Sequence, residues 1–273
     1  WNVFEGLDTD SYAVDTGSAG DFTGCVSFLG YPVFFKEDHI YKVYGSIPSN
    51  FEVMGSATLG VAKGCGGSLA IAGERLLYLS TSGVMIYSGG IPQSLHDAFG
   101  MTRLRGGRAG SDGLKYYLSA QDEAGDWKLY VYDTRKGMWH IEDKTHATHF
   151  CRYQGNTYFL TAEGEIALTG NILDAPEGCT DEGDFTWFAE TGDFTEKGSS
   201  QSTSYDSVKK GIAKLWVRIE VAAGAEAKVL MQFDSDGKWV QAGQTLKGEK
   251  KRSYYLPIVP RRADHYRIRI EGK

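Results

Sequence analysis

The segment Tyr78-Leu-Ser-Thr-Ser-Gly83-Val-Met-Ile-Tyr-Ser-Gly89 decides how this sequence is read, because its pattern occurs a second time. It aligns without gaps with Phe159-Leu-Thr-Ala-Glu-Gly164-Glu-Ile-Ala-Leu-Thr-Gly170, at an offset of 159 − 78 = 81 residues. Each copy has an apolar run, a polar turn and a second run that ends at glycine, which is the pattern of a β-hairpin. Gly83 and Gly164 occupy the same turn position, where we expect a positive φ that strains other residues.

Two more hairpins of this kind complete a repeat. One covers residues 34–45, which begin 78 − 34 = 44 residues before the first copy, and the other covers 116–133, between the two copies. Units that recur about every 40 to 44 residues have the spacing of four-stranded propeller blades. We therefore predict an all-β fold with a propeller-like repeat domain of about four blade units over residues 1–175. The one helix that we expect there is a short one from Gln93 to Phe99.

The composition changes after the repeat. Residues 176–204 are rich in Gly, Asp, Glu, Ser and Thr, which is typical of a connecting segment. We predict a linker that could contain a strand at Trp187 and Phe188. In the serine-rich run 199–204 we expect no regular structure.

Beyond the linker, apolar and polar residues alternate. In 214–221, Leu, Val, Ile and Val alternate with Lys, Trp, Arg and Glu, and similar alternation recurs in 229–233 and 266–271. Antiparallel strands with one buried and one solvent-facing side have this pattern. We predict that residues 205–273 form a small antiparallel β-sandwich domain.

The net charge of −6 conceals two parts of opposite sign. Residues 1–204 contain 14 Lys and Arg against 27 Asp and Glu, a net charge of −13, whereas residues 205–273 contain 15 against 8, a net charge of +7. A change of sign within one chain indicates a domain boundary and a charged partner.

The remaining composition predicts a globular chain without membrane contact. The sequence has 35 glycines and 13% aromatic residues, and its apolar runs fall far short of the roughly 20 residues that span a bilayer. The four cysteines, Cys25, Cys65, Cys151 and Cys179, form no C-x-x-C pair. We predict reduced, buried thiols, with two disulfides as the alternative.

Two loops resemble ligand-binding motifs but have simpler explanations. Gly64-Cys-Gly-Gly-Ser68 is glycine-rich like a phosphate-binding loop, but its lysine precedes the glycines and no helix is expected after it. We predict a loop between strands. Asp234-Ser-Asp-Gly begins like a calcium loop but lacks the closing carboxylate, so we predict a hairpin turn.

Metal and catalytic sites are likewise not predicted. His140, His146, His149 and Cys151 lie close together in the sequence, but their spacing matches no closed zinc pattern. We therefore predict no catalytic residues, no metal site and no cofactor. A pair of carboxylates from different blades would be invisible in the sequence, so a glycosidase stays open as an alternative.

The densest group of polar residues lies in 257–269, where two prolines are followed by four arginines. Such residues make charge-assisted bonds to a partner or to one another. The candidate interaction residues are Arg261, Arg262, Asp264, His265, Arg267, Arg269, Trp216 and Trp239. They suit an acidic protein surface or DNA phosphates with stacked bases. The alternative is an exposed sheet whose charges keep its edges from pairing.

Six segments carry a family resemblance: Leu29–Asp38, Ser68–Gly73, Tyr87–Ser94, Gly110–Tyr117, Val131–Arg135 and Pro257–Arg269. In these segments, which extend over nearly the whole chain, the sequence resembles a family of virion or tail-region structural proteins encoded in Firmicutes prophages. The resemblance implies a structural role and brings no catalytic residues with it. In general character the chain is also similar to the propeller-bearing hub and stabilisation proteins of phage head-tail junctions.

These observations predict a non-enzymatic structural or assembly protein of the phage virion, assembled in the bacterial cytoplasm. It would dock with other virion proteins and self-associate at the tail or the head-tail junction. The main alternative is a carbohydrate-binding or carbohydrate-cleaving tail adhesin, since propellers and sandwiches both hold sugars on aromatic platforms. DNA contact through residues 205–273 is a less favoured alternative, and it would weaken steeply with salt.

Overall fold

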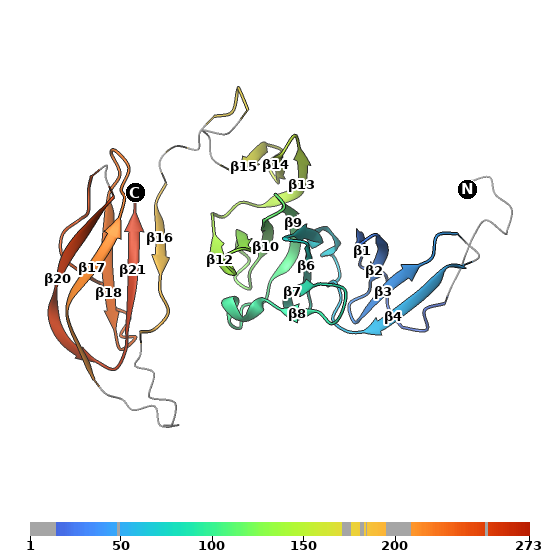
Figure 1. The fold of residues 1–273 in the computed structure, drawn as a ribbon, viewed down its shortest axis with the longest axis horizontal. Helices are drawn as coiled ribbons and strands as arrows, with labels where there is room; N and C mark the ends of the chain where they lie inside the picture. The colour runs from blue at the N-terminus through green and yellow to red at the C-terminus, as the bar shows by residue number, and fades with distance from the viewer. Residues whose placement is uncertain are drawn as a thin grey trace. The chain divides into compact units, whose positions relative to one another are not determined.

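The computed structural model describes residues 15–47, 50–170, 176–180, 183, 185–194, 209–248 and 251–273 (Figure 1). These residues form an all-β protein with six small antiparallel sheets, none of which is closed, and short 3-10 turns. Among them there is no helix of the length and hydropathy needed to span a membrane. The chain separates into two compact units, Trp1–Cys179 and Thr180–Lys273.

The N-terminal unit contains four sheets whose strands are neighbours both in sequence and in space. The first sheet consists of β1 (Gly24–Phe28), β2 (Tyr31–Phe35), β3 (His39–Tyr44) and β4 (Glu52–Ala57). The second consists of β5 (Ala70–Ala72), β6 (Arg75–Ser80), β7 (Gly83–Tyr87) and β8 (Gln93–Ser94). The third consists of β9 (Arg105–Ser111), β10 (Lys115–Gln121), β11 (Trp127–Asp133) and β12 (Met138–Ile141), and the fourth of β13 (Ala147–Tyr153), β14 (Asn156–Thr161) and β15 (Ile166–Thr169).

The repeat in the sequence corresponds to these four sheets. The predicted hairpins are the strand pairs β2 and β3, β6 and β7, β10 and β11, and β14 and β15. The turn glycines have the expected conformation, with φ of 113° at Gly83 and 90° at Gly164. The four hairpin predictions are confirmed, because strand alternation and turn glycines are local signals.

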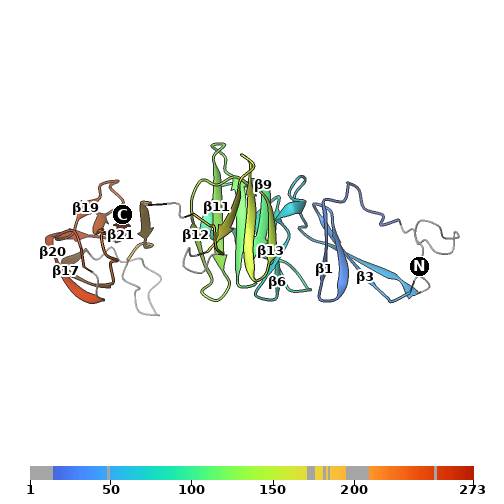
Figure 2. The ribbon, with the colours of Figure 1, turned by 90° about the horizontal axis from the view of Figure 1, so that it is seen from above.

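The sheets of this unit are stacked face against face. Strands β6 and β7 are buried at nearly every position, because the neighbouring sheets cover both faces of the second sheet. In the third sheet, Tyr116 and Leu118 belong to the core shared with the first two sheets, whereas the intervening Tyr117 packs on the opposite face. Phe150 of the fourth sheet contacts that opposite face. Figure 2 shows strands β6, β9, β11 and β13 of these sheets next to one another.

The predicted helix at Gln93 to Phe99 is wrong in its type and extent. Gln93 pairs with Ile86 and forms β8, the last strand of the second sheet. Within this segment only His96–Phe99 are helical, and they form a 3-10 turn that ends before Gly100. The Phe99 ring holds this turn against Trp139, at a centroid distance of 4.8 Å. Pairing with a neighbouring strand therefore overrides the local helical signal.

The prediction of buried thiols is correct only for Cys65. All four cysteines are free, but Cys25, Cys151 and Cys179 are exposed. Cys25 and Cys151 alternate with residues that pack against the next sheet, so their own side chains point away from it. Their exposure follows from the strand pattern rather than from any polar partner.

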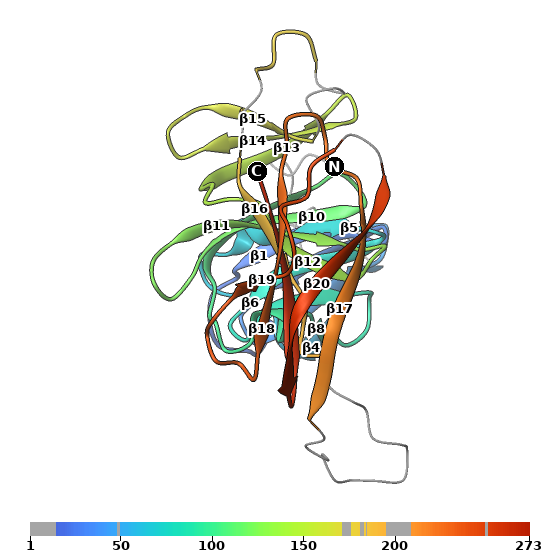
Figure 3. The same cartoon turned by 90° about the vertical axis from the view of Figure 1, so that its left-hand side faces the viewer.

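The C-terminal unit consists of two sheets over one core. One has the order β16 (Trp187–Glu190), β21 (Tyr266–Gly272), β18 (Ala227–Phe233) and β19 (Val240–Gln241), and the other pairs β17 (Lys210–Ile219) with β20 (Arg252–Ala263). Leu256 of β20 and Met231 of β18 are both fully buried in that core. Figure 3 shows β17 and β20 running beside each other within this unit. The predicted alternation in 214–221, 229–233 and 266–271 thus puts the apolar side of each strand inward.

The segment predicted as a linker contributes a strand to the C-terminal unit. Strand β16 lies within 176–204 and pairs with β21, with Glu190 opposite Arg269. The serine-rich run 199–204 lies outside the described residues. Division at residue 180 also changes the charges: the N-terminal unit has 13 basic and 21 acidic residues, a net of −8, and the C-terminal unit has 16 and 14, a net of +2.

Candidate functional site

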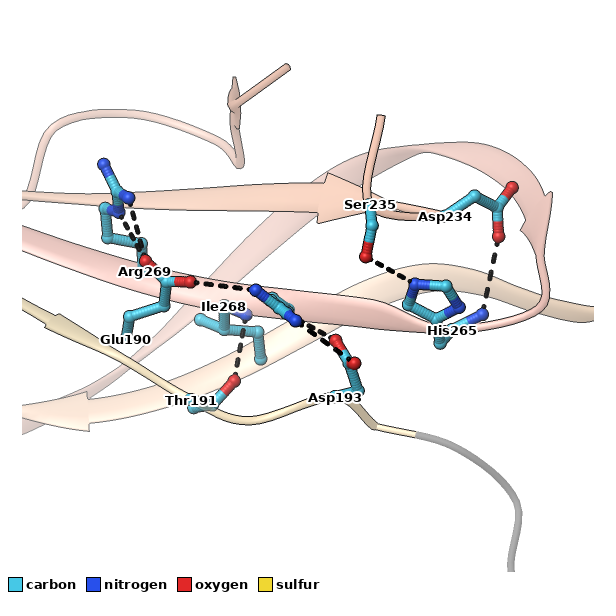
Figure 4. A network of polar contacts seen from close by, with 9 residues as sticks. Glu190, Thr191, Asp193, Asp234, Ser235, His265, Ile268 and Arg269 are labelled. Atoms are coloured by element: carbon cyan, nitrogen blue, oxygen red, sulfur yellow. Dashed lines mark hydrogen bonds and ion pairs between the residues drawn. The ribbon is translucent and has the colours of Figure 1, made fainter. Parts of the chain in front are cut away.

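The candidate arginines on β21 form ion pairs inside the C-terminal unit. Arg267 donates from Nε and Nη2 to the Asp193 carboxylate, at 2.5 and 3.3 Å, and its Nη1 lies 3.6 Å from Glu190. Arg269 donates from Nε and Nη2 to Glu190, at 3.1 and 2.8 Å. Glu190 is the last residue of β16, and Asp193 lies just after this strand. The ion pairs therefore connect the edge strand β16 to β21 (Figure 4).

Arg269 also lies between two aromatic rings. Its guanidinium carbon is 4.9 Å from the ring centroid of Phe188 and 4.2 Å from that of Trp239. Phe188 belongs to β16 and Trp239 directly precedes β19, so one arginine contacts both edges of the four-stranded sheet. Each such contact contributes about 0.5–1 kcal/mol at an exposed site. Trp239 therefore stabilises the sheet instead of standing free as a stacking group.

The predicted residues after β20 bind the turn that follows β18. The backbone N–H of Asp264 donates to Asp234 Oδ1 at 2.7 Å. Ser235 Oγ lies 2.8 Å from His265 Nε2 (Figure 4). Asp234 and Ser235 have φ of 52° and 51°, a conformation typical of tight turns. The segment 234–237 is therefore the predicted hairpin turn. Its Asp234 and Ser235 side chains bind Asp264 and His265, which lie between β20 and β21.

The carboxylates in these contacts have lowered pKa values. The hydrogen bond from Arg267 lowers the pKa of Asp193, and Asp193 in turn raises the pKa of Arg267. The backbone N–H of Lys238 lowers the pKa of Asp236, and Arg261, whose Nη1 lies 3.2 Å away, adds to the effect. These groups remain charged at neutral pH and act as structural ion pairs.

A second group of residues faces outward from the β17–β20 sheet. Trp216 and Tyr255 are opposite each other in the register, with exposed fractions of 64% and 52% and ring centroids 5.3 Å apart. Lys214 and Arg218 flank Trp216 on the same side of β17 and are exposed. We name these four residues the cation-aromatic face.

The cations of the cation-aromatic face differ from those of β21. Among the described residues, no carboxylate lies within 4.0 Å of Lys214 or Arg218, and Glu220, just after β17, pairs with neither. Arg262, opposite Gly211 in the register, is exposed as well. Of the eight predicted residues, Trp216, Arg261 and Arg262 thus lie on this sheet, and Arg261 forms an ion pair with Asp236 there.

The N-terminal unit has an acidic hollow that the sequence analysis did not single out. Its volume is about 560 Å³, and it is open to solvent. Trp127 and His146 stack in it with ring centroids 3.6 Å apart and an interplanar angle of 10°. Asp126, Asp143 and Glu163 line it, and none of these carboxylates forms an ion pair with a described residue, although Lys144 also lines the hollow.

Sequence signals existed for one of these two features. Lys214 and Arg218 alternate with apolar residues, so they could be placed beside Trp216 on an exposed side. The acidic hollow could not be found in this way, because its carboxylates come from a turn in the third sheet, a turn in the fourth sheet and the segment between these sheets, and they are brought together only by the stacking.

The other motifs occupy simple structural positions. Among the described residues there is no group of three or more metal-ligating side chains. His146 stacks on Trp127, and His140 lies 3.3 Å from Glu142. The glycine-rich loop forms a 3-10 turn at Gly66–Ser68 and leads into β5, as expected for a loop between strands.

The sequence matches no protein-family model, and no curated protein is significantly similar to it.

Proposed function

We propose that this chain is a structural or assembly protein of a tailed-phage virion and acts by docking with other virion proteins at the tail or head-tail junction. The observation that carries the proposal is the contrast between two sets of cations in one unit. Those on β21 are neutralised by carboxylates, whereas Lys214 and Arg218 flank exposed aromatic rings and have no carboxylate partner in the part of the chain that the structure describes. No catalytic role is assigned to any residue.

The exposed aromatic rings support a docking role in energetic terms. Trp and Tyr are the residues that contribute most to protein interfaces, and flanking charges set the orientation and the rate of association. Paired cations such as Arg267 have little left to offer a partner, because their donors are already engaged. The cation-aromatic face combines the two properties that a docking surface needs.

The proposed architecture is a propeller-like repeat domain followed by a small sandwich. Four successive up-and-down sheets stacked face against face support the first part, since blades of a propeller are built and packed in this way. Two sheets that share one apolar core support the second part. Both architectures offer rigid surfaces for assembly contacts.

The proposal is tested by locating the chain in phage particles. Mass spectrometry of gradient-purified virions should detect its peptides, and antibodies against the chain should label one fixed position near the tail by electron microscopy. Detection only in the lysate of infected cells, and never in virions, would refute the proposal.

The acidic hollow favours a second candidate function, carbohydrate binding by a tail adhesin. A Trp ring beside carboxylates and the Thr161 side chain is the type of surface that holds sugar rings and their hydroxyl groups. A glycan array should then detect binding that Trp127→Ala abolishes. An array without binding removes this candidate.

DNA contact is a weaker candidate. The positive charge of 205–273 suggested it, but β16 and the residues beside it bring carboxylates to Arg267 and Arg269 and belong to the same unit. The net charge of +2 on the whole unit therefore gives less reason to expect binding to phosphates than +7 did.

A further inference from the structure

We infer that this protein associates with further copies of itself, the cation-aromatic face of one copy docking into the acidic hollow of the next. The inference rests on the proposed function, because it names the partner in the docking that we propose. A second copy of the chain is then the partner of both the cation-aromatic face and the acidic hollow.

The first surface presents an aromatic projection with positive charges beside it. Trp216 is 64% exposed although it lies in the middle of a long strand, and Tyr255 supports its ring from the paired strand. Lys214 and Arg218 lie two residues to either side of it on the same side of β17. In a strand this spacing puts the two cations about 13 Å apart along the strand, with the indole between them.

The second surface presents the opposite arrangement. Its hollow of about 560 Å³ exceeds the volume of one indole side chain and is lined by the stacked rings of Trp127 and His146. Asp126 and Glu163 line it, from the turn before β11 and the turn between β14 and β15. Both carboxylates are exposed and form no ion pair with a described cation.

Charge complementarity favours a second copy as the occupant. The two surfaces belong to units of net charge −8 and +2. Among the described residues, the cations of the face and the carboxylates of the hollow form no ion pairs, although Lys144 also lines the hollow. Both surfaces carry aromatic rings beside their charges, and interfaces combine aromatic contacts with polar ones. The two surfaces are different, so the contact is heterologous and builds rings or open stacks of copies. Such assemblies suit a position around a tail axis.

The test uses two charge-reversed variants of the full chain. In the first, Lys214→Glu and Arg218→Glu reverse the face, and in the second, Asp126→Lys and Glu163→Lys reverse the hollow. The control, Lys228→Glu with Lys238→Glu, makes the same charge change at exposed positions elsewhere in the C-terminal unit. Sedimentation velocity over a concentration series at about 0.05 M and about 0.5 M salt measures association, since screening weakens contacts between charges.

The natural chain and the control should associate at low salt and dissociate at high salt. Each reversed variant alone should associate at least about tenfold more weakly at low salt, because like charges would face each other. An equimolar mixture of the two reversed variants should recover association, since each reversed surface then meets its opposite on the other variant. Circular dichroism of every variant checks that the fold is retained.

Three results would overturn the inference. One is a natural chain that stays monomeric at low salt, and another is a mixture that associates no better than its components. The third is a natural chain that binds single-stranded DNA or a glycan through these residues while remaining monomeric. In each case virion localisation could still be positive, so the proposed function would stand with a different partner.

Discussion

At the scale of single residues, the clearest feature is that the arginines most suggestive of a binding site act in the fold. Arg267 and Arg269 lie in a dense basic run, and in sequence they look available to a partner. Their carboxylates come from 74 to 79 residues earlier in the chain, in β16 and just after it. No local pattern could reveal that pairing, because it depends on which strand occupies the edge of the sheet.

Asp193→Asn should loosen β16. The variant loses the charge that Arg267 binds through two nitrogens, and partly exposed ion pairs of this kind contribute up to about 1 kcal/mol. Hydrogen exchange of the amides in Trp187–Glu190 should become faster, while exchange in β18 stays unchanged. Asp21→Asn is the control, since its carboxylate is almost fully exposed. Equal exchange in the Asp193 variant and the natural chain would contradict a structural role for the pair.

The same carboxylate gives the stability a dependence on pH. The pKa of Asp193 is lowered in the folded chain, so its contribution is complete above the unfolded value of about 3.9 and is lost as the pH falls through the folded value. The side chain is 36% exposed, so solvent screens the effect and it is small. Urea unfolding at pH 7 and at pH 3 should give a smaller difference for Asp193→Asn than for the natural chain. A larger difference would mean that the sign of this linkage is wrong.

At the scale of elements, the sequence was most informative where the structure is most local. The four hairpins were found because an apolar strand, a polar turn and a second strand lie within 12 residues in three of them and within 18 in the fourth. In the N-terminal unit, the strands outside the four hairpins were not assigned, because their position depends on pairing with a hairpin; β8, for example, has two residues and pairs with β7. The cation-aromatic face was partly predicted: the alternation put Lys214 and Arg218 on the same side of the strand as Trp216, but only Trp216 was named as an interaction residue.

The two equivalent turn glycines allow conformational and steric effects to be separated. Gly83→Ala should destabilise its hairpin more than Gly164→Ala does. Both substitutions put alanine at positive φ, which costs about 1–2 kcal/mol, but only at Gly83 would the new Cβ also collide with the His96 ring, 2.2 Å from Cγ. At Gly164 no atom lies within 4 Å. Thermal unfolding of the two variants compares the costs, and equal losses would exclude the steric contribution.

At the scale of the whole molecule, charge indicated that the chain has two parts but not how the charge is used. The excess of acid over residues 1–204 includes Glu190 and Asp193, which belong to the C-terminal unit and neutralise its arginines. Counting charge along the sequence therefore overestimates the positive potential of the C-terminal part. The contrast of −13 and +7 becomes −8 and +2 when the division follows the structure.

This division predicts how two fragments should bind DNA. Residues 205–273 lack β16, so Arg267 loses Asp193 and Glu190, and Arg269 loses Glu190 but keeps Glu271 at 3.6 Å, whereas residues 180–273 retain all of these carboxylates. Each arginine that becomes available to a phosphate adds about 0.9 to the magnitude of the slope of log K against log salt concentration. The slope for the shorter fragment should therefore be larger in magnitude by about 1.8. Binding to a fluorescent duplex over a series of salt concentrations measures both slopes. Glu190→Gln with Asp193→Asn in the longer fragment should reproduce the steeper slope. Because this variant keeps β16, it separates the effect of removing the two carboxylates from the effect of removing the strand. Identical slopes for the two fragments and the double variant would mean that the ion pairs with Glu190 and Asp193 do not prevent Arg267 and Arg269 from binding phosphates.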